Sequence, residues 1–192
     1  MTARKSLLVL VLLLFALPAV AEEYDAAASQ DAWAASAVPG EAHALLATRA
    51  GDWTLVSKSW LAPDAEPMVS SAESTGEMIL GGRFLTEKVT GTAMGMAFEG
   101  FALTGYDNHT HVVTSIWVDT MGTLTSVMTG VYEKIGEPME LFGTMLDPAS
   151  GMEIKTRTVT TFISDDAHTM VYYMSMGDTP EMKGMELTYT RK

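Results

Sequence analysis

The residues from Phe98 to Met121 constrain the fold more than any other segment of the chain. They read FEGFALTGYDNHTHVVTSIWVDTM, in which apolar and polar side chains alternate on both sides of the cluster Asp107-Asn108-His109. Alternation with a period of two is typical of a half-buried β-strand, and clusters of Asp and Asn are typical of tight turns. The segment therefore predicts two antiparallel strands joined by a short turn, the second ending in Trp117-Val118-Asp119.

Alternating segments of the same kind recur from residue 51 to the C-terminus, separated by clusters of Gly, Asp and Pro. We expect strands at about 53–61, 68–79, 84–93, 96–106, 112–120, 124–132, 139–146, 153–163, 169–176 and 182–190. About ten strands with short connections predict an all-β fold, a single antiparallel up-and-down barrel. Several strands carry polar or small residues on both faces, which favours a barrel with a partly polar interior over the alternative, a two-layer β-sandwich.

A short helix is predicted before the first strand, at residues 41–49. Pro39 and Gly40 precede it, Leu45 and Leu46 give it an apolar side, and Gly51 lies just beyond its end. After Gly51 the pattern changes to the period of a strand. We expect this helix to cap one end of the barrel.

The first 21 residues have the three parts of a secretory signal peptide. A basic start is followed by an apolar run at 7–17 and by the small-residue site Ala19-Val20-Ala21. Pro18 ends the apolar run well short of the roughly 20 residues that a membrane span needs. We expect cleavage before Glu22, export to the periplasm or the exterior, and no stable membrane insertion afterwards. Residues 22–38 are Ala-rich and acidic and predict a flexible linker, and residues 39–192 form the barrel domain.

Charge and cysteine content exclude several classes of function. The signal peptide holds two of the 12 basic residues and none of the 24 acidic ones, so cleavage leaves a net charge of −14. Such a charge opposes phosphate backbones, and we expect no nucleic-acid partner. The chain has no cysteine, which excludes disulfides, thiolate metal sites and cysteine nucleophiles.

Four stretches of the domain carry a family resemblance when read in order. They are PGEAHALLATRAGDW at the start, ILGGRFLTEK, the centre FEG…TGYD…WVDTM, and the close GMELTYTRK. Over Pro39 to Lys192 the chain resembles the family catalogued as domain of unknown function 1579. That family resembles calycin-type barrels such as lipocalins and fatty-acid-binding proteins. The resemblance implies a calycin-like fold and supplies no catalytic residues.

The sequence offers little for metal or acid–base chemistry. His109 and His111 share a strand face if extended and could bind Cu(II) or Zn(II), but Asp107 is the one obvious third ligand, and solvated turn residues are far commoner. No metalloprotease helix, nucleophile elbow or phosphate-binding glycine loop occurs. We expect no metal and no cofactor.

Fifteen methionines are the unusual feature of the composition. Met94 with Met96, and Met174 with Met176, have the spacing of a shared strand face. Core packing is the first interpretation, because methionine fills irregular apolar spaces. A soft lumen that adapts to an apolar ligand is the second, and Cu(I) held by thioethers is the third.

The candidate ligand site centres on the strand that follows the Asp107 turn. Trp117 and Asp119 share a face and could stack a ligand and anchor its polar end. We expect Tyr106 to join them from the neighbouring strand. The remaining candidates are Arg83, Arg157 and Tyr172 as polar complements, and Met174 and Met176 as apolar lining. In the alternative interpretation Trp117 plugs the barrel floor and Asp119 caps a turn.

These observations favour an exported β-barrel that binds a small apolar or amphipathic molecule. One alternative is an enzyme in which Asp119 and a nearby Arg or Tyr act as acid and base. Another is a filled barrel that acts through its acidic surface. A catalytic role is the less favoured of the readings, and the sequence does not predict an oligomeric state.

Overall fold

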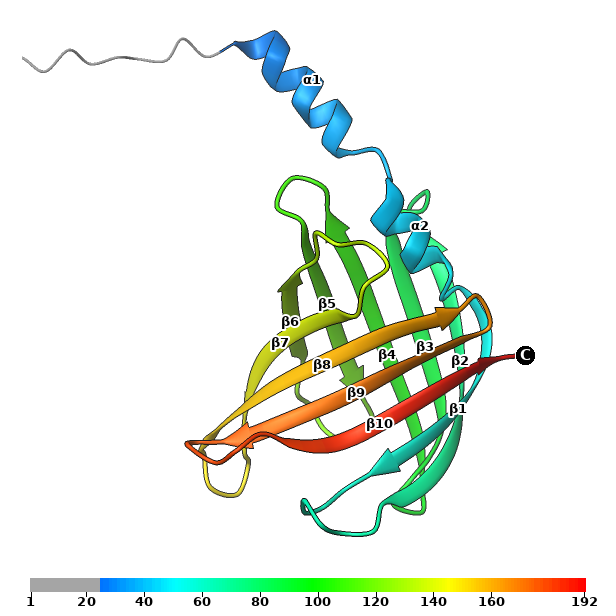
Figure 1. Cartoon of the computed structure of the whole chain (residues 1–192), viewed down its shortest axis with the longest axis vertical. Coiled ribbons are helices and arrows are strands. Elements are labelled where there is room, and N and C mark those ends of the chain that lie inside the picture. The colour runs from blue at the N-terminus through cyan, green and yellow to red at the C-terminus, as the bar shows by residue number, and fades with distance from the viewer. Residues whose placement is uncertain (1–24) are drawn as a thin grey trace, which may run out of the picture.

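The computed structural model describes residues 25–192, and the predicted signal peptide lies outside that range. Ten antiparallel strands form a closed barrel in which each strand pairs with its neighbours in sequence and β1 closes on β10 (Figure 1). The strands are β1 Gly51–Ser59, β2 Met68–Ile79, β3 Phe84–Ala93, β4 Met96–Asp107, β5 Val112–Asp119, β6 Ser126–Val131, β7 Met139–Leu146, β8 Glu153–Ser164, β9 Ala167–Met176 and β10 Met182–Arg191. The predicted up-and-down barrel is confirmed, and the sandwich alternative is wrong.

Within residues 25–192, two helices precede the barrel. α2, Glu41–Ala47, lies at one end of it and buries Ala42, His43 and Leu46 (Figure 1). The helix is thus shorter than predicted, but it caps the barrel as expected. α1, Ala26–Ser36, falls in the predicted flexible linker, begins at an Asp25 cap and buries none of its side chains. It projects away from the barrel (Figure 1). Among residues 25–192, no helix is both long and apolar enough to cross a membrane.

The barrel is filled at the end that α2 covers, which we call the closed end. Trp53, Leu55, Leu85, Val113 and Met139 are almost fully buried there or in the middle of the barrel. All five alternate with less buried neighbours along the chain, so the packing follows the period-two pattern of the sequence. Burial of such side chains contributes about 1.5–3 kcal/mol each to folding.

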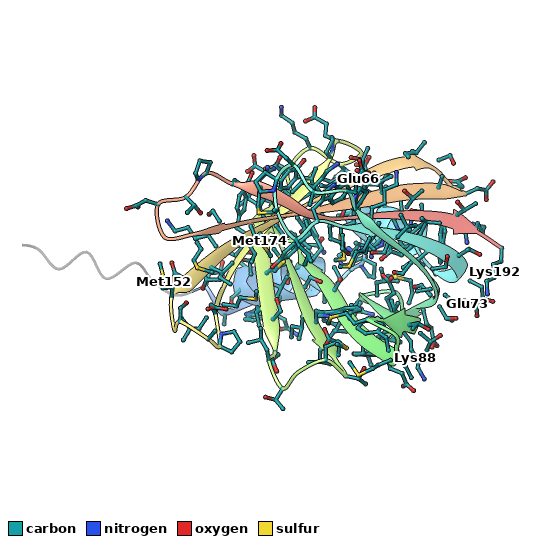
Figure 2. The ribbon with its side chains drawn as sticks, turned by 90° about the horizontal axis from the view of Figure 1, so that it is seen from below. Glu66, Glu73, Lys88, Met152, Met174 and Lys192 are labelled. Carbon is teal, nitrogen blue, oxygen red and sulfur yellow. The ribbon has the colours of Figure 1, made fainter. Side chains whose placement is uncertain are left out.

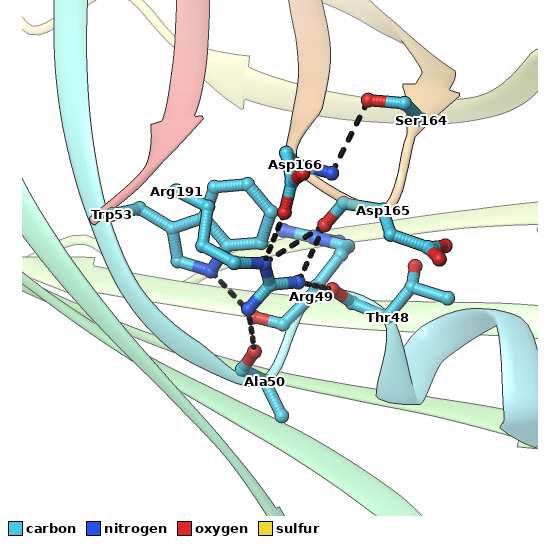
Figure 3. A network of polar contacts seen from close by, with 8 residues as sticks. All are labelled: Thr48, Arg49, Ala50, Trp53, Ser164, Asp165, Asp166 and Arg191. Atoms are coloured by element: carbon cyan, nitrogen blue, oxygen red, sulfur yellow. Dashed lines mark hydrogen bonds and ion pairs between the residues drawn. The ribbon is translucent and has the colours of Figure 1, made fainter.

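Arg191, the last residue of β10, joins several chain segments at the closed end of the barrel. Its guanidinium lies 4.2 Å above the Trp53 ring and donates hydrogen bonds to the carbonyl oxygens of Thr48, Ala50 and Asp165 (Figure 3). One cation therefore satisfies the orphan carbonyls behind α2 and ties β10 to the helix–strand connection.

The strands β6 and β7 pair at fewer positions than any other neighbouring strands of the barrel. A single residue pair, Thr129 with Phe142, joins these strands, whereas β7 and β8 pair at eight positions. A shallow outer hollow at these strands is lined by residues such as Val127, Phe142 and Lys155.

Candidate functional site

The strand register places Trp117 and Asp119 on the inner face of the barrel. Trp117 pairs with buried Ala102, and Asp119 pairs with buried Gly100. Val118, between them, is exposed and points outward. Both residues therefore face the interior, as their alternation in the sequence predicts.

The Trp117 indole lies along the inner wall toward the middle of the barrel. It stacks on Phe98 with ring centroids 6.3 Å apart and planes 23° apart. It also packs against the buried cluster of Trp53, Leu55, Val89 and Tyr189. Trp117 thus lies against the buried cluster and stacks on Phe98.

Asp119 uses both of its carboxylate oxygens within its own strand end. One oxygen accepts the Trp117 Nε1–H at 2.7 Å, and the other accepts the Met121 backbone N–H at 2.8 Å. The carboxylate therefore fixes the indole and caps the connection that follows β5. Charge-assisted hydrogen bonds of this length hold both groups in one geometry.

Tyr172, Met174 and Met176 face the interior from the opposite wall. Their partners on β8 are Thr158, Thr156 and Ile154, all of which are buried. Burial raises the pKa of the Tyr172 phenol, an effect that a hydrogen bond with Thr156 partly offsets. This wall therefore combines apolar thioethers with a neutral phenol.

The end of the interior away from α2 is accessible to solvent. Figure 2 views the molecule from below, with Met174 near the centre of the view. Many inward-facing side chains at this end are half-buried, whereas most of their counterparts beneath α2 are buried. The half-buried set comprises Ser57, Ser59, Ala72, Phe98, Trp117, Asp119, Ser126, Met174, Met176, Met182 and Met185. We call this set the open end.

Tyr106 does not join Trp117. It faces inward, but it pairs with Val113 beneath α2, four positions along β4 from the residue that pairs with Trp117. Four residues of strand span roughly 13 Å. The reason is hairpin geometry: residues close to the turn pair with each other, and Trp117 is far from that turn. The Tyr106 hydroxyl instead shares a hydrogen bond with His111 Nδ1 at 2.8 Å.

The two arginines proposed as polar complements also lie outside the interior. Arg83 is in the exposed turn between β2 and β3 and donates to the Leu80 carbonyl at 3.1 Å. Arg157 occupies an outward position on β8 and binds Glu181 at 2.6 Å and Glu140 at 3.3 Å. Neither guanidinium reaches Asp119.

Asp107, the third metal ligand considered, binds residues of its own turn. Asp107 accepts hydrogen bonds from the His109 backbone N–H and the Thr110 hydroxyl, both at 2.8 Å. Those bonds lower the pKa of the Asp107 carboxyl. Within residues 25–192, no group of three or more His, Cys, Asp or Glu side chains is placed to hold a metal ion.

A buried ion pair that the sequence reading missed lies inside the closed end. Arg49 Nη2 contacts Glu87 Oε2 at 2.7 Å, with side-chain exposures of 11% and 7%. Ser74 donates to the other Glu87 oxygen at 2.9 Å. The alternation of β3 could have revealed Glu87 in the sequence, because Glu87 lies on the same inner face as Leu85 and Val89.

His168 lies beside this pair and is enclosed by aromatic rings. It stacks on Tyr189 at 4.1 Å and meets the Trp53 ring edge-on at 4.7 Å. Burial, followed by the charges of Arg49 and Arg191, lowers the pKa of His168 from 6.5 to about 3. Its Nε2 has no hydrogen-bond partner.

Comparison with known proteins now identifies the family. Residues 38–191 match the family described as protein of unknown function, DUF1579. The chain belongs to DUF1579. None of the curated proteins matches this DUF1579 chain significantly.

Two solved structures resemble the DUF1579 barrel. The crystal structure of Rv2717c from M. tuberculosis is 17% identical, with a TM-score of 0.55, and the match covers 81% of this chain and 99% of that one. A redesigned β-barrel is 13% identical with a TM-score of 0.39, and 79% and 96% of the two chains are covered. The similarity to Rv2717c shows the barrel fold alone.

Proposed function

We propose that this DUF1579 protein binds a small apolar or amphipathic molecule in the open end of its barrel. The observation that carries the proposal is the contrast between the two ends. Most inward-facing side chains beneath α2 are buried, and many at the opposite end are half-buried, which supports an accessible interior beyond Trp117. Concave, largely apolar sites with a few polar groups are typical of small-molecule binding.

The lining indicates how such a molecule would lie. Phe98 and Trp117 form an aromatic surface at the base of the open end, and methionines line the opposite wall. The hydroxyls of Ser57 and Ser59 lie nearer the rim. An apolar portion would therefore contact the aromatic and thioether groups, and a polar end would lie toward solvent.

The arrangement around Asp119 favours a binding protein over an enzyme. An acid–base mechanism needs a second titratable group close to the first. Both Asp119 oxygens already accept hydrogen bonds, and Arg83 and Arg157 bind partners outside the interior. Tyr172 lies on β9, across the barrel from β5.

Native mass spectrometry of protein purified from its own host tests the proposal, and a retained ligand is the expected result. Titration with the neutral fluorophore N-phenylnaphthylamine is the complementary assay. We expect saturable binding that quenches Trp117 emission, read as the difference between the natural chain and Trp117→Phe, because the chain has four tryptophans. A probe that does not bind, combined with no retained ligand, would count against the proposal.

Matched variants localise the binding. Trp117→Ala removes the aromatic base of the open end and should weaken probe binding about tenfold or more. His109→Ala alters an exposed turn and should leave binding unchanged. Thermal unfolding of both variants verifies that the barrel is intact. Equal effects of the two substitutions would place the probe elsewhere.

We also propose that the protein is exported and that its mature chain starts at Glu22. The basic, apolar and small-residue segments of residues 1–21 support this. N-terminal sequencing of the protein from its host should return Glu-Glu-Tyr. A chain that retains Met1 would contradict it.

A further inference from the structure

We propose that methionines at the open end form a thioether site for Cu(I), with Met174, Met182 and Met185 as ligands. The methionine spacing in the sequence admitted this chemistry beside core packing, and the structure adds the placement of the side chains. The inference is independent of the proposed apolar ligand, because the thioether sulfur and the apolar bulk of methionine can be tested separately.

The first observation is the register between β9 and β10. Met174 lies directly opposite Met182, and both side chains are half-buried on the inner face. Directly opposed residues on an antiparallel pair have Cβ atoms about 4.5–5.5 Å apart. Two flexible thioethers at that separation can turn their sulfurs toward one point.

The second observation is a bulge in β10. The register shifts between Lys183 and Met185, and Gly184 is the extra residue. The side chain of Met174 lies against Gly184: its Cε, Cγ and Sδ are 3.4–3.6 Å from the position that a Cβ on this glycine would take. The Met174 thioether therefore packs at ordinary contact distance against Gly184, the residue of the bulge that lies between Met182 and Met185 in sequence.

The third observation is the chemistry of the neighbouring groups. Inward positions around Met174 carry Thr156, Gly143 and Ile154, and a further methionine, Met176, follows on the same face. Lys183 and Glu186 bind each other at 2.9 Å. A neutral set of three thioethers suits a soft monovalent ion such as Cu(I), and it is a poor site for Zn(II) or Ca(II).

A competition titration tests the site. Full-length mature protein is titrated with Cu(I) against bathocuproine disulfonate, under ascorbate and without oxygen, and Ag(I) serves as a redox-stable probe of the same ligands. We expect one ion per chain by native mass spectrometry. X-ray absorption of the copper complex should show sulfur neighbours, and the ε-methyl resonances of Met174, Met182 and Met185 should shift with Ag(I).

Leucine substitutions separate the thioether from its bulk. Met174→Leu with Met182→Leu keeps the apolar volume and should weaken Cu(I) binding by about tenfold or more. Thermal unfolding of this variant verifies that the barrel is intact, since only the sulfurs are lost. The control is Met94→Leu with Met96→Leu, a pair of exposed methionines at the β3–β4 turn, with exposures of 79% and 56%.

Three results would overturn the proposal. They are the absence of Cu(I) uptake by the natural chain, equal affinity in the Met174/Met182 variant, and an equal loss in the Met94/Met96 control. Failure of the probe titration with retained Cu(I) binding would instead count against the apolar ligand alone.

Discussion

Gly100 and Trp117 are fitted to each other across β4 and β5: the indole of Trp117 occupies the space that a Cβ at residue 100 would need. Gly100 has no positive φ, so its conformation does not require glycine. The missing side chain is what lets the indole lie flat against the wall beside Phe98 and reach Asp119 with its Nε1–H. The base of the open end therefore depends on this glycine.

Gly100→Ala should destabilise the protein by about 1–3 kcal/mol, because the added methyl forces the indole out of its position. Urea unfolding measures the change, and the emission of Trp117 should shift as its surroundings change. Gly122→Ala is the control, since a Cβ there meets only the Leu124 backbone nitrogen at 3.9 Å. Equal effects at the two positions would contradict this packing.

The barrel and the inner face of β5 could be predicted because both depend on local alternation. A period of two assigns each residue to a face, and successive strands joined by short turns become neighbours. The same reasoning places Met174 and Met176 inside. For Tyr106 this reasoning gave the correct face, because the side chain points into the barrel. It gave the wrong position along the barrel axis, because that position depends on the pairing register, which puts Tyr106 beneath α2.

The arginines show a different limit of the sequence. Arg157 alternates between buried Thr156 and Thr158 and is thereby outward-facing, a deduction that the strand pattern already allowed. The contacts of Arg191 could not be deduced, because its hydrogen bond to Ala50 joins residues 141 positions apart. Barrel closure alone creates that proximity. The ion pair of Arg49 and Glu87 does not depend on closure, because Arg49 precedes β1 and Glu87 lies on β3, two strands along in the meander.

Glu87→Leu should destabilise the protein by about 3–5 kcal/mol. The substitution leaves the buried Arg49 guanidinium without its partner, and an uncompensated charge costs more than the pair contributes. Urea unfolding at neutral pH gives the difference. Lys88→Met breaks the exposed pair of Lys88 and Glu99, 3.7 Å apart, and should cost no more than about 1 kcal/mol.

The double variant Arg49→Met with Glu87→Leu distinguishes a lost attraction from a stranded charge. Apolar residues of similar volume often replace a buried pair at little cost. We therefore expect the double variant to be more stable than Glu87→Leu alone. If the double variant lost as much stability as the two single variants combined, the explanation by desolvation would be refuted.

Asn108→Ala should release the segment between α1 and α2 from the barrel. The Asn108 amide donates to the carbonyl oxygens of Ser36 at 2.9 Å and Val38 at 2.8 Å, and these bonds attach the segment to the β4–β5 turn. Hydrogen exchange at residues 26–40 should accelerate, while the barrel melts at nearly the same temperature. Thr110→Ala, in the same turn, should leave that exchange unchanged, and a result in the opposite order would contradict the attachment.

His168 should make the protein less stable as the pH falls below 6.5. Burial holds the pKa of the folded imidazole at about 3, against 6.5 when it is free. Between these values the unfolded chain binds a proton that the folded chain does not, so stability is present above pH 6.5 and is lost as the pH falls toward 3. The slope approaches about 1.4 kcal/mol per pH unit. Urea unfolding at pH 7.5 and 5.5 should therefore differ by about that amount.

His168→Phe isolates this contribution. Phenylalanine keeps the stack on Tyr189 and the edge contact with Trp53, and it removes the buried nitrogen that lacks a partner. Burial also lowers the pKa of His43, so a weaker dependence of the same sign should remain in the variant. The stability difference between the two pH values should shrink by about 1.4 kcal/mol in His168→Phe and stay unchanged in His109→Gln, whose side chain lies on an exposed turn. An unchanged difference in His168→Phe would mean that the imidazole is hydrated in the folded protein, and the closed end would then be less dry than its packing indicates.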